Sequence, residues 1–125
     1  MDIALKDIPE TSMARVRARD REGWLALFTE DAVVEDPVGP CDWDPEGTGQ
    51  RGKAAIGAFY DMFSGFQTSF DFTLHQVEPR GNEVAAVVTA RIVKTDGTVG
   101  ETRMINIYKQ APDGRIQSLR SFWNA

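Results

Sequence analysis

Asp36 is the residue of this sequence best placed to do chemistry. It follows the apolar residues Ala32 and Val34 at two-residue spacing, and Pro37 ends the strand directly after it. Alternate residues of a strand share a face, so a strand that buries Ala32 and Val34 also points Asp36 inward. A carboxylate at the edge of an apolar cavity is a candidate general base, because partial burial raises its pKa toward the working range. The alternative is that Asp36 only caps the turn that begins at Pro37.

The other reactive side chains are weaker candidates. Cys41 is the only cysteine, which excludes an internal disulfide and a metal site made of several cysteines. The only histidine, His75, lies far from Cys41 in the sequence, so a catalytic Cys-His pair has no support. The alternating pattern around His75 favours a surface or interface position. No dinucleotide, phosphate-loop or zinc motif occurs, so we expect a function that needs no metal and no cofactor.

Composition limits the partners and predicts one domain over residues 1–125. The chain is 42% hydrophobic, and its 14 basic and 19 acidic residues give a formal net charge of −5. The basic residues are scattered, which argues against nucleic acid and against anionic membrane surfaces as partners. The sequence shows no secretory signal and no apolar run long enough to span a membrane. We therefore expect a cytoplasmic protein.

The first half of the chain has the periodicity of three helices. Asp7 followed by Ile8 and Pro9 predicts an N-cap and a helix that runs through about Arg19, with proline in its first turn. Asp20 is the expected N-cap of a short second helix that reaches Phe28. The stretch 37–52 contains three prolines and four glycines, so we expect an irregular loop beside the cavity. Lys53–Phe63 is the third helix, with an apolar stripe made of Ile56, Phe59, Tyr60 and Phe63.

The second half predicts a meander of four antiparallel strands. Alternating or β-branched segments cover residues 70–75, 83–93, 98–110 and 115–123. Turn sequences rich in glycine, proline and aspartate separate them at residues 79–82, 95–97 and 111–114. Helices followed by a run of strands are typical of an α+β domain.

Several segments of the chain resemble the ketosteroid isomerases. They are the runs DREGWLALFTEDAVVEDPVG at 20–39 and RGKAAIGAFY at 51–60, together with GRIQ at 114–117 and Phe122-Trp123. The similarity is greatest to the mycobacterial steroid-isomerase-like proteins, a branch of the nuclear transport factor 2-like and SnoaL-like superfamily. The resemblance implies a cone-shaped α+β fold, with three N-terminal helices packed in a curved and mostly antiparallel sheet. It also implies a homodimer and a hydrophobic, steroid-like ligand.

The resemblance also assigns roles to individual residues. In ketosteroid isomerases an aspartate base moves a proton next to a carbonyl, while a tyrosine and a protonated aspartate stabilise the enolate oxygen. Asp36 matches the base. Ser12 stands at the position of the oxyanion tyrosine and Asn106 at that of the oxyanion aspartate, where its amide can still donate a hydrogen bond. Tyr60 matches a second tyrosine of the family that supports the first.

Three aromatic residues, Trp123, Phe59 and Phe63, have two interpretations. Trp123 matches an aromatic residue that lines the pocket of the family beside the base, but aromatic side chains also fill ordinary cores. In the first interpretation, an apolar slot for a flat hydrophobic ligand forms from Trp123, Phe59, Phe63, Val34 and Met104.

Three functions remain open from the sequence. The first is a steroid delta-isomerase-like activity, in which Asp36 transfers a proton of a steroid-like ketone with Asn106 and Tyr60 near the enolate oxygen. The second is a protein that binds a steroid or polyketide-like ligand without turnover, favoured by serine at position 12. The third is a SnoaL-like polyketide cyclase. Asp71 and Arg91 also leave open the Asp-Arg-Asp arrangement of epoxide hydrolases that share the fold.

Overall fold

The computed structural model describes residues 3–125. A single turn of 3-10 helix at Leu5–Asp7 precedes the first α-helix. The α-helices are α1 (Ile8–Arg17), α2 (Arg21–Leu25) and α3 (Lys53–Gly65), and the strands are β1 (Phe28–Glu35), β2 (Gln50–Arg51), β3 (Gln67–Arg80), β4 (Glu83–Lys94), β5 (Val99–Gln110) and β6 (Ile116–Phe122).

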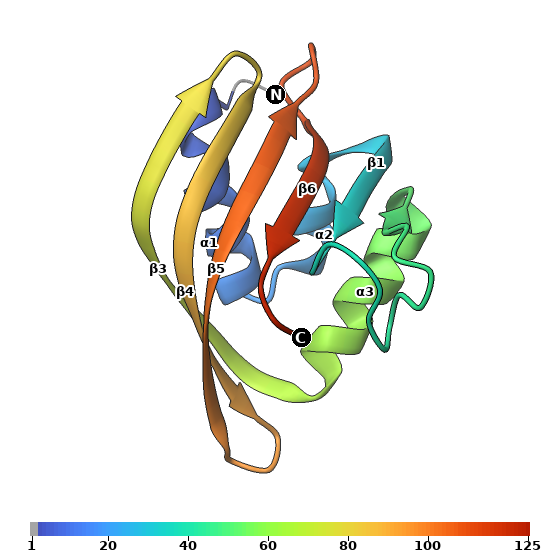
Figure 1. Ribbon diagram of the computed structural model, residues 1–125, viewed down its shortest axis with the longest axis vertical. Helices are drawn as coiled ribbons and strands as arrows, with labels where there is room; N and C mark the ends of the chain where they lie inside the picture. Colours follow the sequence, from blue (N-terminus) through green and yellow to red (C-terminus); the bar gives the residue numbers. More distant parts are fainter. Residues whose placement is uncertain (1–2) are drawn as a thin grey trace.

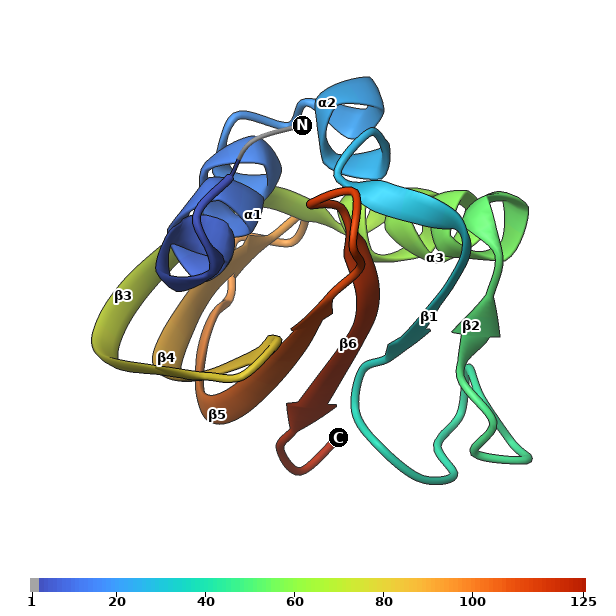
Figure 2. The ribbon, with the colours of Figure 1, turned by 90° about the horizontal axis from the view of Figure 1, so that it is seen from above.

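The strands form a six-stranded sheet in the order β2-β1-β6-β5-β4-β3. Strands β1 and β6 run parallel, and every other neighbouring pair is antiparallel. The sheet is curved, and the three helices lie on its concave side (Figures 1 and 2). The predicted α+β fold, with three helices packed in a curved and mostly antiparallel sheet, is therefore confirmed. Among residues 3–125, no helix combines the length and the apolar character needed to cross a membrane.

The ends of the first two helices follow from local chemistry. Asp20 is the N-cap of α2, as predicted, because its Oδ1 accepts a hydrogen bond of 2.9 Å from the backbone N–H of Gly23. Asp7 makes no such side-chain bond to α1. Helix α1 ends at Arg17, two residues earlier than predicted, because Arg19 adopts the left-handed conformation with φ of 56°.

Strand pairing overrides the helical pattern after Leu25. The spacing of Leu27 and Phe28 predicted that α2 continues through them, but Phe28 is the first residue of β1. The backbone N–H of Ile116 donates to the carbonyl of Leu27 at 2.7 Å, so a partner distant in the sequence sets this boundary. The long loop is likewise shorter than predicted, since its last residues form β2 and pair with Val33 and Val34.

Strand β1 faces inward as its alternating pattern predicted. Ala32 and Val34 have no exposed surface, and Met13 and Val16 of α1 are buried. The four residues of the predicted apolar stripe of α3 are at least half-buried. The main core contains Ile8, Trp24, Leu27, Phe28, Val34, Ile56, Tyr60, Val84, Tyr108, Ile116 and Leu119, among others.

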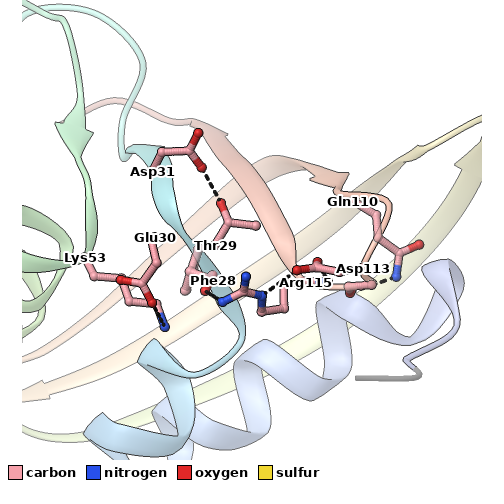
Figure 3. Close-up of polar contacts among 9 residues, drawn as sticks. Phe28, Thr29, Glu30, Asp31, Lys53, Gln110, Asp113 and Arg115 are labelled. Atoms are coloured by element: carbon pink, nitrogen blue, oxygen red, sulfur yellow. Dashed lines mark hydrogen bonds and ion pairs between the residues drawn. The ribbon is translucent and has the colours of Figure 1, made fainter.

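Polar contacts hold the first half of β1 against the turn before β6 (Figure 3). The guanidinium of Arg115 donates to Asp113 Oδ2 at 2.9 Å and to the carbonyl oxygen of Phe28 at 3.5 Å. At the start of α3, Lys53 Nζ lies 3.5 Å from Glu30 Oε1. These exposed pairs add little energy individually, but they fix the strand that ends beside Asp36.

Candidate active site

An apolar cavity of about 380 Å³ lies between the helices and the concave face of the sheet. Its walls come from all three helices, from strands β3 to β6, and from the segments that follow β1 and β6. A volume of this size falls in the usual range of small-molecule sites, which are mostly apolar with a few polar groups that orient the ligand. All three tryptophans of the chain, Trp24, Trp43 and Trp123, line it.

Asp36 lies at the cavity because β1 and β6 run in parallel. Glu35 pairs with Arg120, which brings Asp36 beside Ser121 and Trp123 at the end of β6. The indole N–H of Trp123 donates to Asp36 Oδ1 at 2.6 Å. The indole N–H of Trp43 donates to the backbone carbonyl of Asp36 at 3.0 Å. The two indole rings stack with their centroids 6.1 Å apart, so Trp43 of the loop after β1 packs against the ring that contacts the carboxyl group.

The loop that carries Trp43 is held by one buried carboxylate. Asp44 accepts hydrogen bonds from the backbone N–H groups of Thr48 at 3.2 Å and Gly49 at 2.9 Å. Farther back, the backbone N–H of Val38 donates to the carbonyl of Ser121 at 2.8 Å. The predicted position of this loop beside the cavity is confirmed, since Trp43 forms part of the wall.

Burial raises the pKa of the Asp36 carboxyl group above its ordinary value. The hydrogen bond from Trp123 and the nearby Ser121 hydroxyl favour the ionised form and oppose this effect, but burial is the larger contribution. A carboxylate with a raised pKa in an apolar site is a stronger base than one in water. It is suited to taking a proton from a weak carbon acid and returning it.

Asn106 faces the same end of the cavity from the neighbouring strand. Asn106 of β5 is paired with Ser121 of β6, and the Ser121 hydroxyl donates to Asn106 Oδ1 at 2.5 Å. Both residues are buried. Because its oxygen is engaged, Asn106 keeps its NH₂ group to donate to a ligand. Asp36, directly after β1, thus forms a row with Ser121 of β6 and Asn106 of β5.

Ser12 reaches the cavity from α1 and meets a buried phenol. Its Oγ accepts a hydrogen bond of 3.1 Å from the indole N–H of Trp24. The Ser12 hydroxyl and the Asn106 amide both lower the pKa of the nearby phenol of Tyr108, which follows Asn106 by two residues on β5. Burial raises the pKa of Tyr108 to about 12, and the negative charge of Asp36 contributes to the increase. Tyr108 is therefore a neutral phenol at ordinary pH.

The structure brings most of the predicted site residues to this cavity, but two lie elsewhere. Its walls include Asp36, Asn106, Ser12, Trp123, Phe59, Phe63 and Met104. Val34 is fully buried in the core behind the wall. Tyr60 packs on the far side of Trp24 and Phe63, with ring centroids 5.6 and 5.1 Å away, and it does not line the cavity.

The epoxide-hydrolase arrangement does not occur at Asp71 and Arg91. Both residues are exposed, and Asp71 forms an ion pair of 3.2 Å with Arg17. His75 is also exposed, as predicted, and its Nε2 lies 2.7 Å from Thr89 Oγ1. Within the described range 3–125, no group of three or more His, Cys, Asp or Glu side chains could hold a metal ion.

Four residues of the site were not identified from the sequence. They are Tyr108, Ser121, Trp24 and Trp43. Tyr108 had a usable signal, because strand alternation places it on the face of Asn106. Ser121 had none, since a lone serine near the end of a strand is unremarkable until β1 and β6 pair in parallel.

Comparison with known proteins agrees with this geometry. The sequence model of the SnoaL-like domain matches residues 10–119. The chain belongs to the SnoaL-like domain family. The resemblance of this SnoaL-like chain to the ketosteroid isomerase-like branch is confirmed by two of the solved structures that follow.

Three solved structures are similar to this SnoaL-like protein over nearly the whole chain. The Δ5-3-ketosteroid isomerase from Mycobacterium sp. is 37% identical with a TM-score of 0.88, and the match covers 96% of this chain and 92% of that one. RV0760c from Mycobacterium tuberculosis, in complex with estradiol-17β-hemisuccinate, is 33% identical with a TM-score of 0.89, covering 98% and 95%. A computationally designed 17-OHP binder is 31% identical with a TM-score of 0.86, covering 96% and 92%.

Proposed function

We propose that this SnoaL-like protein is a steroid delta-isomerase-like enzyme that needs no cofactor. The observation that carries the proposal is the Asp36 carboxyl group, whose pKa is raised by burial at an apolar cavity, with the Asn106 amide facing the same space. In the proposed reaction, Asp36 removes a proton from the carbon next to a ketone carbonyl. The substrate becomes an enolate, and the protonated Asp36 returns the proton to the γ carbon, which moves the double bond into conjugation.

The similar structures support a steroid-like substrate for this chain. One of them is a ketosteroid isomerase from Mycobacterium sp., and another was solved with a steroid derivative bound. The aromatic wall residues Phe59, Phe63 and Trp123 offer flat apolar surfaces to a fused-ring ligand. We therefore propose a hydrophobic small molecule with a ketone at the end that meets Asp36.

A second candidate is ligand binding without turnover. It is favoured by the hydrogen bond of 2.6 Å from Trp123 to Asp36, which stabilises the carboxylate and weakens it as a base. Serine at position 12, where the related enzymes carry the oxyanion tyrosine, points in the same direction.

The outer face of the sheet supports the homodimer that the resemblance implies. Ile105 is 48% exposed and Phe122 is 38% exposed, and the two residues are paired across β5 and β6. We propose that this pair lies in the contact between two copies. Sedimentation should show a dimer for the wild type and a monomer for Ile105→Lys, and a monomeric wild type would contradict the contact.

A steroid turnover assay tests the proposed activity. The protein is mixed with a β,γ-unsaturated 3-ketosteroid, and the conjugated enone is followed by its ultraviolet absorbance. Loss of a general base costs roughly 10²- to 10⁴-fold in rate, so Asp36→Asn should fall by that factor.

The neighbouring carboxylate Glu35 is the matched control. It lies on the opposite face of β1 and pairs with Arg120 at 3.5 Å, so Glu35→Gln should turn over at the wild-type rate. Equal rates for wild type and Asp36→Asn would rule out Asp36 as the base. An inactive wild type whose tryptophan fluorescence is quenched by the steroid would replace the enzyme proposal with the binding one.

A further inference from the structure

We propose that Tyr108 is the phenol that donates a hydrogen bond to the ligand oxygen in this cavity, with Ser12 positioning it. The inference deepens the proposed function and rests on it for the nature of the ligand, a molecule with a carbonyl or enolate oxygen beside Asp36. The position of the oxyanion tyrosine in the related enzymes is occupied by Ser12 in this chain. A donor from β5 takes the place of that phenol.

The backbone brings Tyr108 to the required place. It follows Asn106 by two residues on β5, so the two side chains share the inner face of the sheet. Tyr108 is only 2% exposed, and it lines the cavity together with Asp36, Asn106 and Ser12. Two donors, one amide and one phenol, therefore face the same end of the cavity from one strand.

The hydrogen bonds around Tyr108 leave its own proton for the ligand. Trp24 can only donate, and its N–H occupies Ser12 Oγ at 3.1 Å. The Ser121 hydroxyl occupies Asn106 Oδ1 at 2.5 Å. Ser12 and Asn106 both lower the pKa of Tyr108, as groups that donate to the phenol oxygen do, so Ser12 serves as a donor to that oxygen. The phenol proton is then directed into the cavity.

This arrangement makes a relay of donors from Trp24 through Ser12 to Tyr108. Each donor in such a chain polarises the next, which strengthens the final hydrogen bond. The neutral state of Tyr108 at ordinary pH keeps the proton in place, and the apolar walls keep water from competing for it. The mechanism thus has two oxyanion donors, although the tyrosine at position 12 is missing.

A binding cycle tests the role of Tyr108 without requiring turnover. Titration measures the dissociation constants of two steroids that differ only in one group, an A-ring phenolic steroid and its 3-deoxy analogue. We expect Tyr108→Phe to weaken binding of the phenolic steroid roughly 10- to 100-fold and to leave the 3-deoxy analogue unchanged. Equal losses for both steroids, or no loss for either, would overturn the role of Tyr108.

Two further variants separate this role from packing and from the other phenol. Ser12→Ala removes the second member of the relay, and it should give a smaller loss that is again specific for the phenolic steroid. Tyr60→Phe removes the only other tyrosine, which lies outside the cavity, and no phenol-specific loss is expected. A phenol-specific loss in Tyr60→Phe but not in Tyr108→Phe would assign the donor to Tyr60.

Turnover distinguishes this inference from the proposed function. If the wild type isomerises the ketosteroid, Tyr108→Phe should lower kcat by roughly 10²- to 10³-fold with little change in KM. An inactive wild type that still shows the phenol-specific loss refutes the enzyme proposal and keeps Tyr108 as the ligand-binding donor. A wild type that isomerises while Tyr108→Phe keeps its full kcat refutes Tyr108 as the oxyanion donor and leaves the enzyme proposal standing.

Discussion

Replacement of Trp123 by phenylalanine should shift the ionisation of Asp36 to higher pH. The Trp123 indole N–H donates to Asp36 Oδ1 at 2.6 Å, a short distance for a bond to a charged acceptor. Trp123→Phe keeps an aromatic ring against the cavity and removes only this donor. The remaining influences on the pKa of Asp36 are burial, which raises it, and the Ser121 hydroxyl, which lowers it.

The size of the shift follows from the energy of the lost bond. A hydrogen bond to a charged group contributes about 1.5–3 kcal/mol. Since about 1.4 kcal/mol corresponds to a tenfold change in an equilibrium, the ratio of protonated to ionised Asp36 should increase roughly 10- to 100-fold. The acidic limb of the pH profile of kcat/KM should therefore move upward by about one to two pH units.

Two measurements check this prediction, and one of them does not depend on activity. The pH profile of kcat/KM gives the midpoint of its acidic limb. Carbon NMR of the Asp36 carboxyl group, with the signal assigned by its absence in Asp36→Asn, gives the titration directly. Trp43→Phe is the matched control, because Trp43 donates to the backbone carbonyl of Asp36 and not to its carboxylate. An unmoved titration in Trp123→Phe, or an equal movement in both variants, would refute the reasoning.

Three further outcomes follow from the burial of Asp36, the amide of Asn106 and the cap at Asp20. Because burial raises the folded-state pKa of Asp36, the folded protein holds more protons than the unfolded chain between the two pKa values, and stability falls as pH rises through that window. The melting temperature of Asp36→Asn should therefore exceed that of the wild type at pH 7, and the difference should vanish below about pH 4. A difference that stays constant with pH would contradict this. Asn106→Leu removes the amide donor and should lower kcat roughly 10²- to 10³-fold without moving the pH profile, so a moved profile would show that Asn106 acts through Asp36. Asp20→Ala removes the cap on the Gly23 N–H and should lower the free energy of unfolding, measured in urea, by about 1 kcal/mol. Asp20→Asn keeps a side-chain acceptor and should retain most of this stability. Equal losses in the two variants would contradict a capping role.

The sequence predicted the parts of the fold that local patterns determine. Alternation placed Ala32 and Val34 inward, and turn residues separated the last four strands correctly. The sequence placed Leu27 and Phe28 in a helix because their spacing suits one, and only the pairing of β1 with β6 shows otherwise. Local periodicity cannot reveal a strand partner that lies almost ninety residues away in the sequence.

The sequence predicted those site residues that can be identified individually. It did not predict residues that enter the site only because two distant segments pack together. Asp36 and Asn106 were identified from position and from resemblance. Ser121 and Trp43 become part of the site only through the parallel pairing at Asp36 and the fold of the loop after it. Tyr60 shows the opposite case, since its match to a family tyrosine places it on α3, yet its ring packs behind Trp24 and Phe63.

The central claim is that one carboxyl group moves a proton between two carbons inside the cavity. The most direct test uses a β,γ-unsaturated 3-ketosteroid with deuterium at the carbon between the carbonyl and the double bond. Mass spectrometry of the conjugated product then locates the label. The account predicts that the wild type delivers a substantial part of the deuterium to the γ carbon and that Asp36→Asn forms almost no product. Complete loss of the label to solvent, with Asp36→Asn as fast as wild type, would contradict it.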